Sequence, residues 1–309
     1  MDCLDEQTML DFLAGRLDGA TTARAREHVA KCEACNAIAT ELIQGAAAHM
    51  RAPESTSYEL VPGAVIAGKY RLVREIGQGG MGVVWEASPP VAIKFLKGFD
   101  ASAKNRFLRE VKIAKSLACV PRVIEVLPDV EAGVPALVME LLVGRPLAKT
   151  GARPPREARR IAWHVANALA EIHRAGLVHR DVKPANIFLL DDSERPVVLL
   201  DLGLAKDTSG LRTKITRTGQ TVGTPAYMAP EQLAGDPSID GRADLWSLGV
   251  VLYEMLQGKK PIAGAPLDLS GIDAATAALL RSLLDPDRSA RPASAELVAG
   301  ALARIDPDG

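Results

Sequence analysis

The sequence has few cysteines, no excess of one charge and no long apolar run. Four of its 309 residues are cysteines, too few for a disulfide scaffold in a chain of this length. The 37 Lys and Arg nearly balance the 38 Asp and Glu, which leaves a formal charge of −1. This balance excludes a protein whose whole surface is held to nucleic acid or to an anionic membrane by charge.

No apolar segment approaches the roughly 18 residues that a membrane span needs. The chain also starts with acidic side chains, where a secretory signal carries basic ones. We therefore expect a cytoplasmic protein that makes no contact with nucleic acid or membrane. The content of 48% hydrophobic and 24% charged residues is typical of a globular chain, and the length suits one large domain or two unequal ones.

Three of the cysteines fall within an acidic, helical segment at the start of the chain. Residues 1–50 contain four Lys and Arg against eight Asp and Glu. The spacing of His28, Cys32 and Cys35 places them on one helix face, and Cys3 can complete a tetrahedral zinc site. A unit this small needs such a metal because its apolar core is small. Two alternatives stay open: buried cysteines on an amphipathic helix, or a Cys-x-x-Cys redox pair.

This segment resembles the zinc-binding anti-sigma-factor family, in which an early cysteine precedes a helix, a turn like Leu17-Asp18-Gly19, and His-x-x-x-Cys-x-x-Cys. The resemblance implies one structural Zn²⁺ per chain and a protein partner, either a sigma factor or another regulator. The acidic excess favours protein over DNA, because DNA binding depends on cationic contacts to phosphate. Residues 51–67 have the Pro, Ser, Thr and Gly content of a linker.

After the linker, the pattern changes from strands to helices. The strand-like stretches are 70–76, 83–86, 91–96 and 136–140, with one helical run at 105–117. Two long helices with apolar faces follow. The first face comprises Ile161, Val165, Leu169 and Ile172, and the second comprises Leu245, Leu248, Leu252 and Met255.

A glycine-rich turn joins the first two strand-like stretches. Residues 77–84 read Gly-Gln-Gly-Gly-Met-Gly-Val-Val, which fits G-x-G-x-x-G-x-V. Glycines allow a hairpin backbone to close over phosphates, although such a sequence is more often simply a turn. A dinucleotide-binding turn would open a helix, whereas residues 83–85 continue a strand, so a Rossmann domain is not expected.

Four further motifs follow in a fixed order. Lys94 lies in an apolar strand, where its charge needs partners, and Glu110 in the next helix can supply one. The other three motifs are His179-Arg180-Asp181-Val182-Lys183-Pro184-Ala185-Asn186, Asp201-Leu202-Gly203 and Ala229-Pro230-Glu231. Each motif alone is compatible with a structural role, but chance does not explain all of them in this order.

The ordered motifs resemble those of the bacterial, eukaryotic-like Ser/Thr protein kinases over about residues 68–303. The resemblance implies an α+β, two-lobed kinase fold at 68–305, with a β-rich N-lobe at 68–142 and a helical C-lobe at 143–305. It implies transfer of the ATP γ-phosphoryl group, with Mg²⁺, to Ser/Thr hydroxyls of protein substrates and of the chain itself. The rival hypothesis is a sequestering regulator that works through its zinc module and carries an inactive or nucleotide-sensing kinase fold.

The resemblance also implies roles for individual residues. Asp181 orients and deprotonates the substrate hydroxyl, Lys183 marks a Ser/Thr kinase, and Lys94 pairs with phosphates while Glu110 holds it. The Mg²⁺ ligands are Asn186 and Asp201. The ATP-binding residues are Gly77, Gly79, Gly82, Val84, Ala92, Lys94, Met139, Glu140 and Leu142. The last three form the gatekeeper and the hinge, which reads adenine through backbone groups.

Structural roles compete for some of these positions. Glu110 is also compatible with a solvated helix charge, and we expect His179 to be a core histidine rather than a general base. Asp244 and Arg291 resemble residues that brace the catalytic loop and pair with Glu231. A pseudokinase is a further alternative, although no nucleotide, metal or base position is substituted.

Arg180 leaves a cation beside the catalytic loop, where a phosphate on the activation segment can bind. By their distance from Gly223-Thr224, Thr216 and Thr218 match the positions that are autophosphorylated in bacterial kinases of this family. The alternative is that they are ordinary loop threonines.

Two stretches depart from the kinase pattern. Residues 84–91, with Pro89-Pro90, leave little room for a turn, so we expect a tight upper lobe. Residues 261–291 are shorter than the corresponding kinase segment, so we expect the helix that usually docks protein substrates to be reduced or absent.

Overall fold

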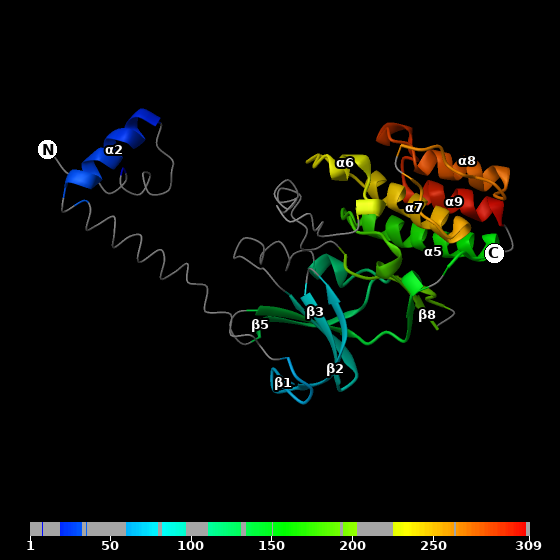
Figure 1. The fold of residues 1–309 in the computed structure, drawn as a ribbon. Coiled ribbons are helices and arrows are strands. Elements are labelled where there is room, and N and C mark those ends of the chain that lie inside the picture. The colour runs from blue at the N-terminus through cyan, green and yellow to red at the C-terminus, as the bar shows by residue number, and fades with distance from the viewer. Residues whose placement is uncertain are drawn as a thin grey trace. The chain divides into compact units, whose positions relative to one another are not determined.

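The computed structural model describes Thr8 and residues 19–32, 35, 60–79, 82–96, 111–130, 134–149, 151–191, 194–202, 225–262 and 264–306. The chain divides into two compact units, Met1–Glu59 and Leu60–Gly309. In the first unit, helix α2 spans Gly19–Lys31 (Figure 1). Ala25 on this helix is buried, as is Cys35 beyond its end. The N-terminal unit is therefore helical in its described part, as the sequence predicted.

An antiparallel six-stranded sheet forms the first lobe of the second unit (Figure 1). In spatial order its strands are β1 Val65–Ile66, β2 Tyr70–Gly79, β3 Gly82–Ser88, β4 Val91–Leu96, β6 Val134–Glu140 and β5 Val123–Val130. Strand β4 lies between β3 and β6 and is buried at every position, and five of its six residues are apolar, with Lys94 as the exception. The turn from β3 to β4 consists of little more than Pro89 and Pro90, and this agrees with the expected tight lobe.

The lobe begins earlier than the sequence predicted. Strand β1, inside the stretch assigned to the linker, pairs with β2, and Leu60 and Ala64 pack on the core of the sheet. These apolar side chains bury against the sheet although Pro and Gly surround them. The described part of the expected linker, residues 60–67, is thus part of the folded lobe.

Helices form the second lobe, together with a three-stranded sheet (Figure 1). The α-helices are α5 Pro155–Arg174, α6 Pro230–Leu233, α7 Arg242–Gln257, α8 Ala274–Leu283 and α9 Ala295–Ile305. The 3₁₀ turns are η1 Leu147–Lys149, η2 Pro184–Asn186, η4 Pro225–Tyr227 and η5 Arg288–Ala290. The small sheet has the order β7 Gly144–Pro146, β8 Ile187–Leu190 and β9 Val197–Leu199. The two-lobed architecture is the one expected.

Burial explains how these helices pack. The predicted apolar face of α5 is buried and contacts α7 and α9. Helix α7 is buried along most of its length because α5 and α8 both pack on it. It ends at Gly258, whose φ of 69° is a left-handed conformation that glycine adopts without strain. Helix α7 is therefore a rigid base for the loops at its N-terminal end.

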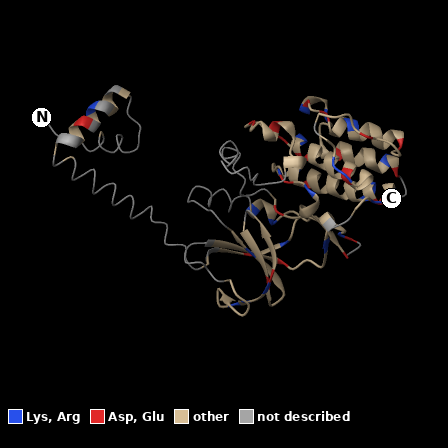
Figure 2. Ribbon diagram, viewed as in Figure 1, with Lys and Arg blue, Asp and Glu red and all other residues tan. Residues whose placement is uncertain are grey.

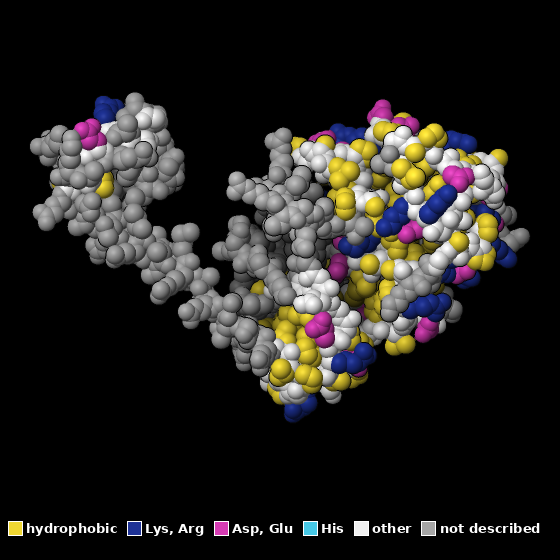
Figure 3. Space-filling view, in the orientation of Figure 1, with side chains coloured by type: hydrophobic (Ala, Val, Ile, Leu, Met, Phe, Trp, Pro, Cys, Tyr) yellow, Lys and Arg dark blue, Asp and Glu magenta, His cyan; other side chains and the backbone are white. Residues whose placement is uncertain are grey.

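Among the described residues of 258–273, none is helical, so α7 leads to α8 through an extended connection. This agrees with the expected reduction of the substrate-docking helix. Charges of both signs are interspersed over the helical lobe (Figure 2), and hydrophobic side chains lie between them on the face shown in Figure 3. No described helix has the length and apolar character that a membrane crossing requires.

Candidate active site

The loop between α5 and β8 brings three of the predicted residues together. Lys183 Nζ donates to Asp181 Oδ2 over 2.9 Å, and Asn186 Nδ2 donates to the Asp181 carboxylate and carbonyl oxygens, each over 2.9 Å. The 3₁₀ turn η2 holds Asn186 in place, with the Asn186 N–H bonded to the Lys183 carbonyl. The Asp181 carboxylate is thus fixed from two sides.

Asp244, at the start of α7, supports this loop from below. Its carboxylate is fully buried and accepts the backbone N–H groups of His179 and Arg180 over 2.8 and 2.7 Å. It also bonds His173 Nε2 over 2.8 Å. Arg180 has a positive φ of 62°, a strained conformation for a residue with a side chain. The two bonds to Asp244 offset that strain, which fits the expected bracing role.

His179 is fully buried beneath the loop, as expected for a core histidine. Its Nε2 faces the Leu200 carbonyl at 3.1 Å, and its Nδ1 accepts the Asp181 N–H at 3.3 Å. A ring with a donor at Nε2 and an acceptor at Nδ1 is neutral. Burial lowers the pKa of His179, against the opposing charge of Asp244. The ring therefore links the catalytic loop to Leu200, next to Asp201, and makes no use of a titrating proton.

Lys94 and Asp201 join the two lobes. The Lys94 ammonium, almost buried in β4, donates to Asp201 Oδ1. Asp201, two residues after the end of β9, adopts a positive φ of 55°. The structure therefore supplies the partner that the lysine charge needs. Glu110, the other expected partner, lies outside the described residues.

Oxygen atoms near this pair suit a divalent cation. One oxygen of Asp201 bonds Lys94, and the amide nitrogen of Asn186 bonds Asp181. Within the described part of the chain, the other Asp201 oxygen and the Asn186 amide oxygen are left for a metal. A carboxylate and an amide oxygen are ligands that Mg²⁺ accepts alongside phosphate oxygens. The donor set thus fits the expected metal.

The glycine-rich turn lies between β2 and β3. Gly77 and Gly79 end β2, and Gly82 begins β3, while residues 80 and 81 are outside the described part. Gly82 has a φ of 150°, and a Cβ there would lie 1.9 Å from the Phe95 carbonyl oxygen. Only glycine fits this position. In the adjoining strands, Val84 pairs with Lys94 across β3 and β4, and Ala92 pairs with Met139 across β4 and β6.

The expected hinge follows β6. Met139 and Glu140 end this strand, and Leu142 belongs to the extended segment after it. The Glu140 N–H donates to the Arg122 carbonyl over 3.0 Å, so this donor is not available to a ligand. The Glu140 side chain makes further contacts with Arg122 and Arg195.

A pocket of about 280 Å³ opens beside the catalytic loop. Its lining comprises Leu147, Ala148, Lys183, Pro184, Ala185, Tyr227, Glu254, Met255 and Lys260. The Tyr227 hydroxyl donates to Glu254 over 2.6 Å, and Lys260 lies 4.7 Å from the centre of the Tyr227 ring. Tyr227, Glu254 and Lys260 could not be selected from the sequence, because they come together only when η4 packs on α7.

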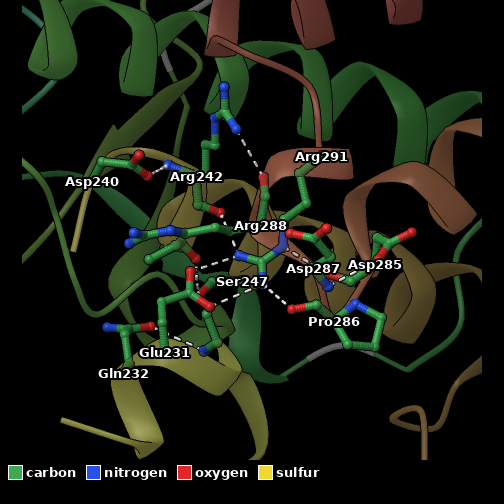
Figure 4. A network of polar contacts seen from close by, with 12 residues as sticks. Glu231, Gln232, Asp240, Arg242, Ser247, Asp285, Pro286, Asp287, Arg288 and Arg291 are labelled. Atoms are coloured by element: carbon green, nitrogen blue, oxygen red, sulfur yellow. Dashed lines mark hydrogen bonds and ion pairs between the residues drawn. The ribbon is translucent and has the colours of Figure 1, made fainter. Parts of the chain in front are cut away.

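A buried ion pair anchors the segment that follows the activation loop (Figure 4). Both terminal nitrogens of Arg291 bond the Glu231 carboxylate, over 2.7 and 2.9 Å. The Arg291 side chain has no exposed surface and also donates to the carbonyls of Asp285, Arg242 and Pro286. Its guanidinium lies over the ring of Trp246. The expected pairing of Arg291 with Glu231 is therefore present, and it ties α6 to the loop before α9.

The activation segment itself, including Thr216 and Thr218, lies outside the described residues. One of its expected contacts is described: Arg180, whose Nε is buried and has no hydrogen-bond partner in the described structure. The Arg180 carbonyl accepts Gln232 Nε2 from α6 over 3.2 Å. The catalytic loop and the segment after the activation loop are thus in direct contact.

In the N-terminal unit, His28, Cys32 and Cys35 each present a ligand atom, and the three atoms lie within 4.8 Å of one another. His28 Nε2 is buried and has no hydrogen-bond partner among the described residues. Thiolates and imidazole are preferred zinc ligands, and a metal would satisfy this nitrogen. The three described residues therefore fit a zinc ion. Cys3, the expected fourth ligand, lies outside the described residues.

Comparison with known proteins agrees with this geometry. Residues 70–301 match the family described as "Protein kinase domain". The DNA damage-responsive serine/threonine-protein kinase RqkA of Deinococcus radiodurans is 40% identical over 219 residues, which cover 66% of this chain and 32% of that protein. Serine/threonine-protein kinase PknA of Mycobacterium tuberculosis is 39% identical over 65% of this chain and 50% of that protein.

Solved structures show the same fold. The crystal structure of the Mycobacterium tuberculosis PknI kinase domain matches with a TM-score of 0.62 and 27% sequence identity, covering 79% of this chain and 99% of that domain. The matched part of this chain spans between about a third and a half of the length of the two curated relatives above.

Proposed function

We propose that this chain, which belongs to the protein kinase domain family, transfers the γ-phosphoryl group of ATP to serine and threonine hydroxyls of proteins. The observation that carries the proposal is the catalytic loop, where Lys183 and Asn186 both bond Asp181. Asp244 accepts the backbone N–H groups of the two residues just before Asp181, His179 and Arg180. Its relatives are named serine/threonine-protein kinases, which favours this function over the rival hypothesis of an inactive scaffold.

Asp181 accepts the proton of the attacking hydroxyl. The hydroxyl oxygen forms a bond to the γ-phosphorus, the bond from that phosphorus to the β,γ-bridging oxygen breaks, and ADP leaves. Lys183, 2.9 Å from the Asp181 carboxylate, is close enough to stabilise the negative charge on the transferred group. Asn186 keeps the carboxylate oriented, so that little reorganisation is needed during the reaction.

Lys94 and Asp201 position the nucleotide. The Lys94 ammonium, held by Asp201, binds the α- and β-phosphates, and Gly77, Gly79 and Gly82 cover the phosphates with backbone N–H groups. Asn186 and Asp201 would hold Mg²⁺, which supplies positive charge that neutralises the phosphates during transfer. The adenine lies between Val84, Ala92 and the hinge at Met139, Glu140 and Leu142.

Protein substrates reach Asp181 past the pocket formed with Tyr227, Glu254 and Lys260. No described residue of 258–273 is helical, so the described part of this segment supplies no docking helix for a substrate. Substrate choice therefore depends mainly on contacts close to the phosphorylated residue.

Activation depends on phosphate added to Thr216 and Thr218 by the kinase itself. Arg180 Nε is buried and has no partner in the part of the chain that the structure describes, and this supports the regulation because a phosphate is a suitable partner for a guanidinium. Mass spectrometry after incubation with Mg-ATP is expected to find phosphate between residues 206 and 223. Full activity with no phosphate in that segment would contradict this part.

The N-terminal unit is a structural zinc module, of the type found in anti-sigma factors, that binds a protein partner such as a sigma factor. Two observations support it: His28, Cys32 and Cys35 converge, and the buried His28 Nε2 has no partner among the residues described in this unit. Ligands of this kind need reduced thiols, so the cytoplasm is the proposed compartment. Metal analysis is expected to find one Zn²⁺ per chain in the wild type and a lower zinc content in Cys32→Ser. Well under one equivalent of zinc in the wild type would contradict the proposed zinc module.

The kinase function is tested by transfer of radiolabelled γ-phosphate from Mg-ATP to a generic protein substrate and to the chain itself. Asp181→Asn and Lys94→Met are expected to abolish transfer. Asp268→Asn and Lys259→Met, which remove an exposed ion pair, serve as matched controls and should retain it. Nucleotide binding without transfer in the wild type would favour the rival hypothesis.

A further inference from the structure

Arg195, in the turn between β8 and β9, contacts the hinge from the opposite lobe. Its Nη1 donates to Glu140 Oε1 over 2.8 Å, and its Nη2 donates to the Val120 carbonyl over 2.7 Å. The Arg195 side chain is 29% exposed and that of Glu140 is 21% exposed, so water only partly screens the pair. A single guanidinium therefore joins the end of β6 to the segment before β5.

Glu140 is fixed by more than this ion pair. Its Oε1 also accepts the Arg122 N–H over 2.7 Å, and its own N–H donates to the Arg122 carbonyl over 3.0 Å. Burial alone would raise the pKa of Glu140, but the hydrogen bonds from Arg122 and Arg195 hold it below its usual range. The carboxylate is therefore charged, and the direction of the Glu140 peptide group follows from where these donors hold it.

The surrounding segment does not need Arg195 to stay in place. The Ala118 N–H bonds Glu171 in α5 over 2.6 Å, and the Leu199 N–H bonds the Cys119 carbonyl over 2.8 Å. These two contacts already hold residues 118–120 against the helical lobe. Arg195 adds a charged contact to Glu140, which belongs to the hinge that is expected to bind adenine.

We propose that Arg195 is a positioning residue for ATP: by holding the Glu140 side chain, it sets the position of the Glu140 carbonyl that adenine contacts. This inference rests on the proposed function, because it takes the hinge as the adenine site. Since GTP shares the ribose and phosphates of ATP, a change confined to the hinge alters the preference between the two nucleotides.

The test compares wild type with Arg195→Met, Arg195→Lys and Glu140→Gln, with Arg74→Met as a matched control. Arg74 pairs with Glu86 on the same sheet but is 69% exposed and away from the hinge. For each protein, KM for ATP, KM for GTP, kcat and KM for a peptide are measured, and Kd is measured with a fluorescent ATP analogue. Because KM does not depend on the fraction of folded enzyme, a loss of stability cannot imitate the effect.

Arg195→Met is expected to raise KM and Kd for ATP at least about fivefold, as expected for a lost charged hydrogen bond. KM for GTP should rise less, kcat and peptide KM should stay within about twofold, and Arg195→Lys should recover part of the loss. The double variant Arg195→Met/Glu140→Gln should lose less affinity for ATP than the product of the two single effects, because both substitutions remove the same contact. ATP constants equal to those of Arg74→Met, or equal losses for ATP and GTP, would overturn the inference.

These outcomes also separate the inference from the proposed function. If the wild type binds the ATP analogue and transfers no phosphate, the proposed function fails, and a weaker Kd in Arg195→Met still supports the positioning role. If the wild type transfers phosphate and Arg195→Met binds ATP normally, the positioning role fails while the kinase function stands.

Discussion

The ion pair of Arg291 with Glu231 offers a stability prediction that the structure makes quantitative. Arg291→Met keeps most of the side-chain volume but removes five hydrogen bonds, to Glu231 and to three carbonyls. The Glu231 carboxylate is then left almost buried without its counter-charge. Breaking a buried pair from one side costs about 3–5 kcal/mol. For a unit of this size, each kcal/mol lowers Tm by about 2–4 °C, so we expect a fall of about 6–20 °C.

Differential scanning calorimetry of the wild type and the variant measures this shift. Arg174→Met is the control, because Arg174 and Glu296 form an exposed pair at 3.6 Å and its loss should change stability by less than about 1 kcal/mol. Arg291→Met/Glu231→Gln should be more stable than Arg291→Met alone, since it no longer buries an unpaired charge. A shift in Arg291→Met no larger than that of Arg174→Met would refute this reasoning.

Three other outcomes follow from the same structure. Burial lowers the pKa of His179, so the contribution of the neutral ring to stability is present above the unfolded pKa, about 6.5, and is lost as the pH falls below it. In urea unfolding, the free energy of unfolding should therefore decrease by up to about 1.4 kcal/mol per pH unit from pH 6.5 to 5.5. A free energy of unfolding that stays constant over this range would contradict this. Gly82→Ala should destabilise the sheet lobe by more than about 1 kcal/mol, because the new Cβ would meet the Phe95 carbonyl. Gly79→Ala is the control, because a Cβ at Gly79 meets open space. Equal unfolding curves for the two variants would contradict this prediction. A zinc chelator should decrease the helical circular dichroism signal of the purified, zinc-loaded wild type and should not change the signal of Cys32→Ser. An identical response of the two proteins to the chelator would argue against a metal at His28.

Motifs with a fixed chemical order could be predicted from the sequence. The strands around Lys94 could be predicted from their apolar runs. The catalytic loop could be predicted because a single reaction sets the spacing of its residues. The support under that loop was also predictable, because Asp244 and Arg291 occupy characteristic places in the same pattern. The geometry then adds what the pattern omits: Asp244 bonds two consecutive N–H groups, and Lys94 bonds Asp201.

Contacts between distant, individually ordinary residues could not be predicted. Arg195 and Val120 are 75 positions apart, and neither belongs to a motif. Strand β1 was missed because Pro and Gly surround its few apolar residues, and they bury only against β2. Strand β5 was missed because it lies at the edge of the sheet, where β6 is its only neighbouring strand in the described sheet. An edge strand need not be uniformly apolar, so its sequence carries a weaker signal. In each case the contact depends on the residues or strand that the segment packs against, and these cannot be read from the segment's own sequence.

The central claim is that Asp181 serves the transfer step while other residues bind the nucleotide. The most direct measurement is single-turnover phosphate transfer by Asp181→Asn, with the Kd for an ATP analogue measured on the same protein. We expect a transfer rate at least about 10²-fold below that of the wild type, with ATP affinity within about twofold. Transfer at the wild-type rate in Asp181→Asn would contradict it.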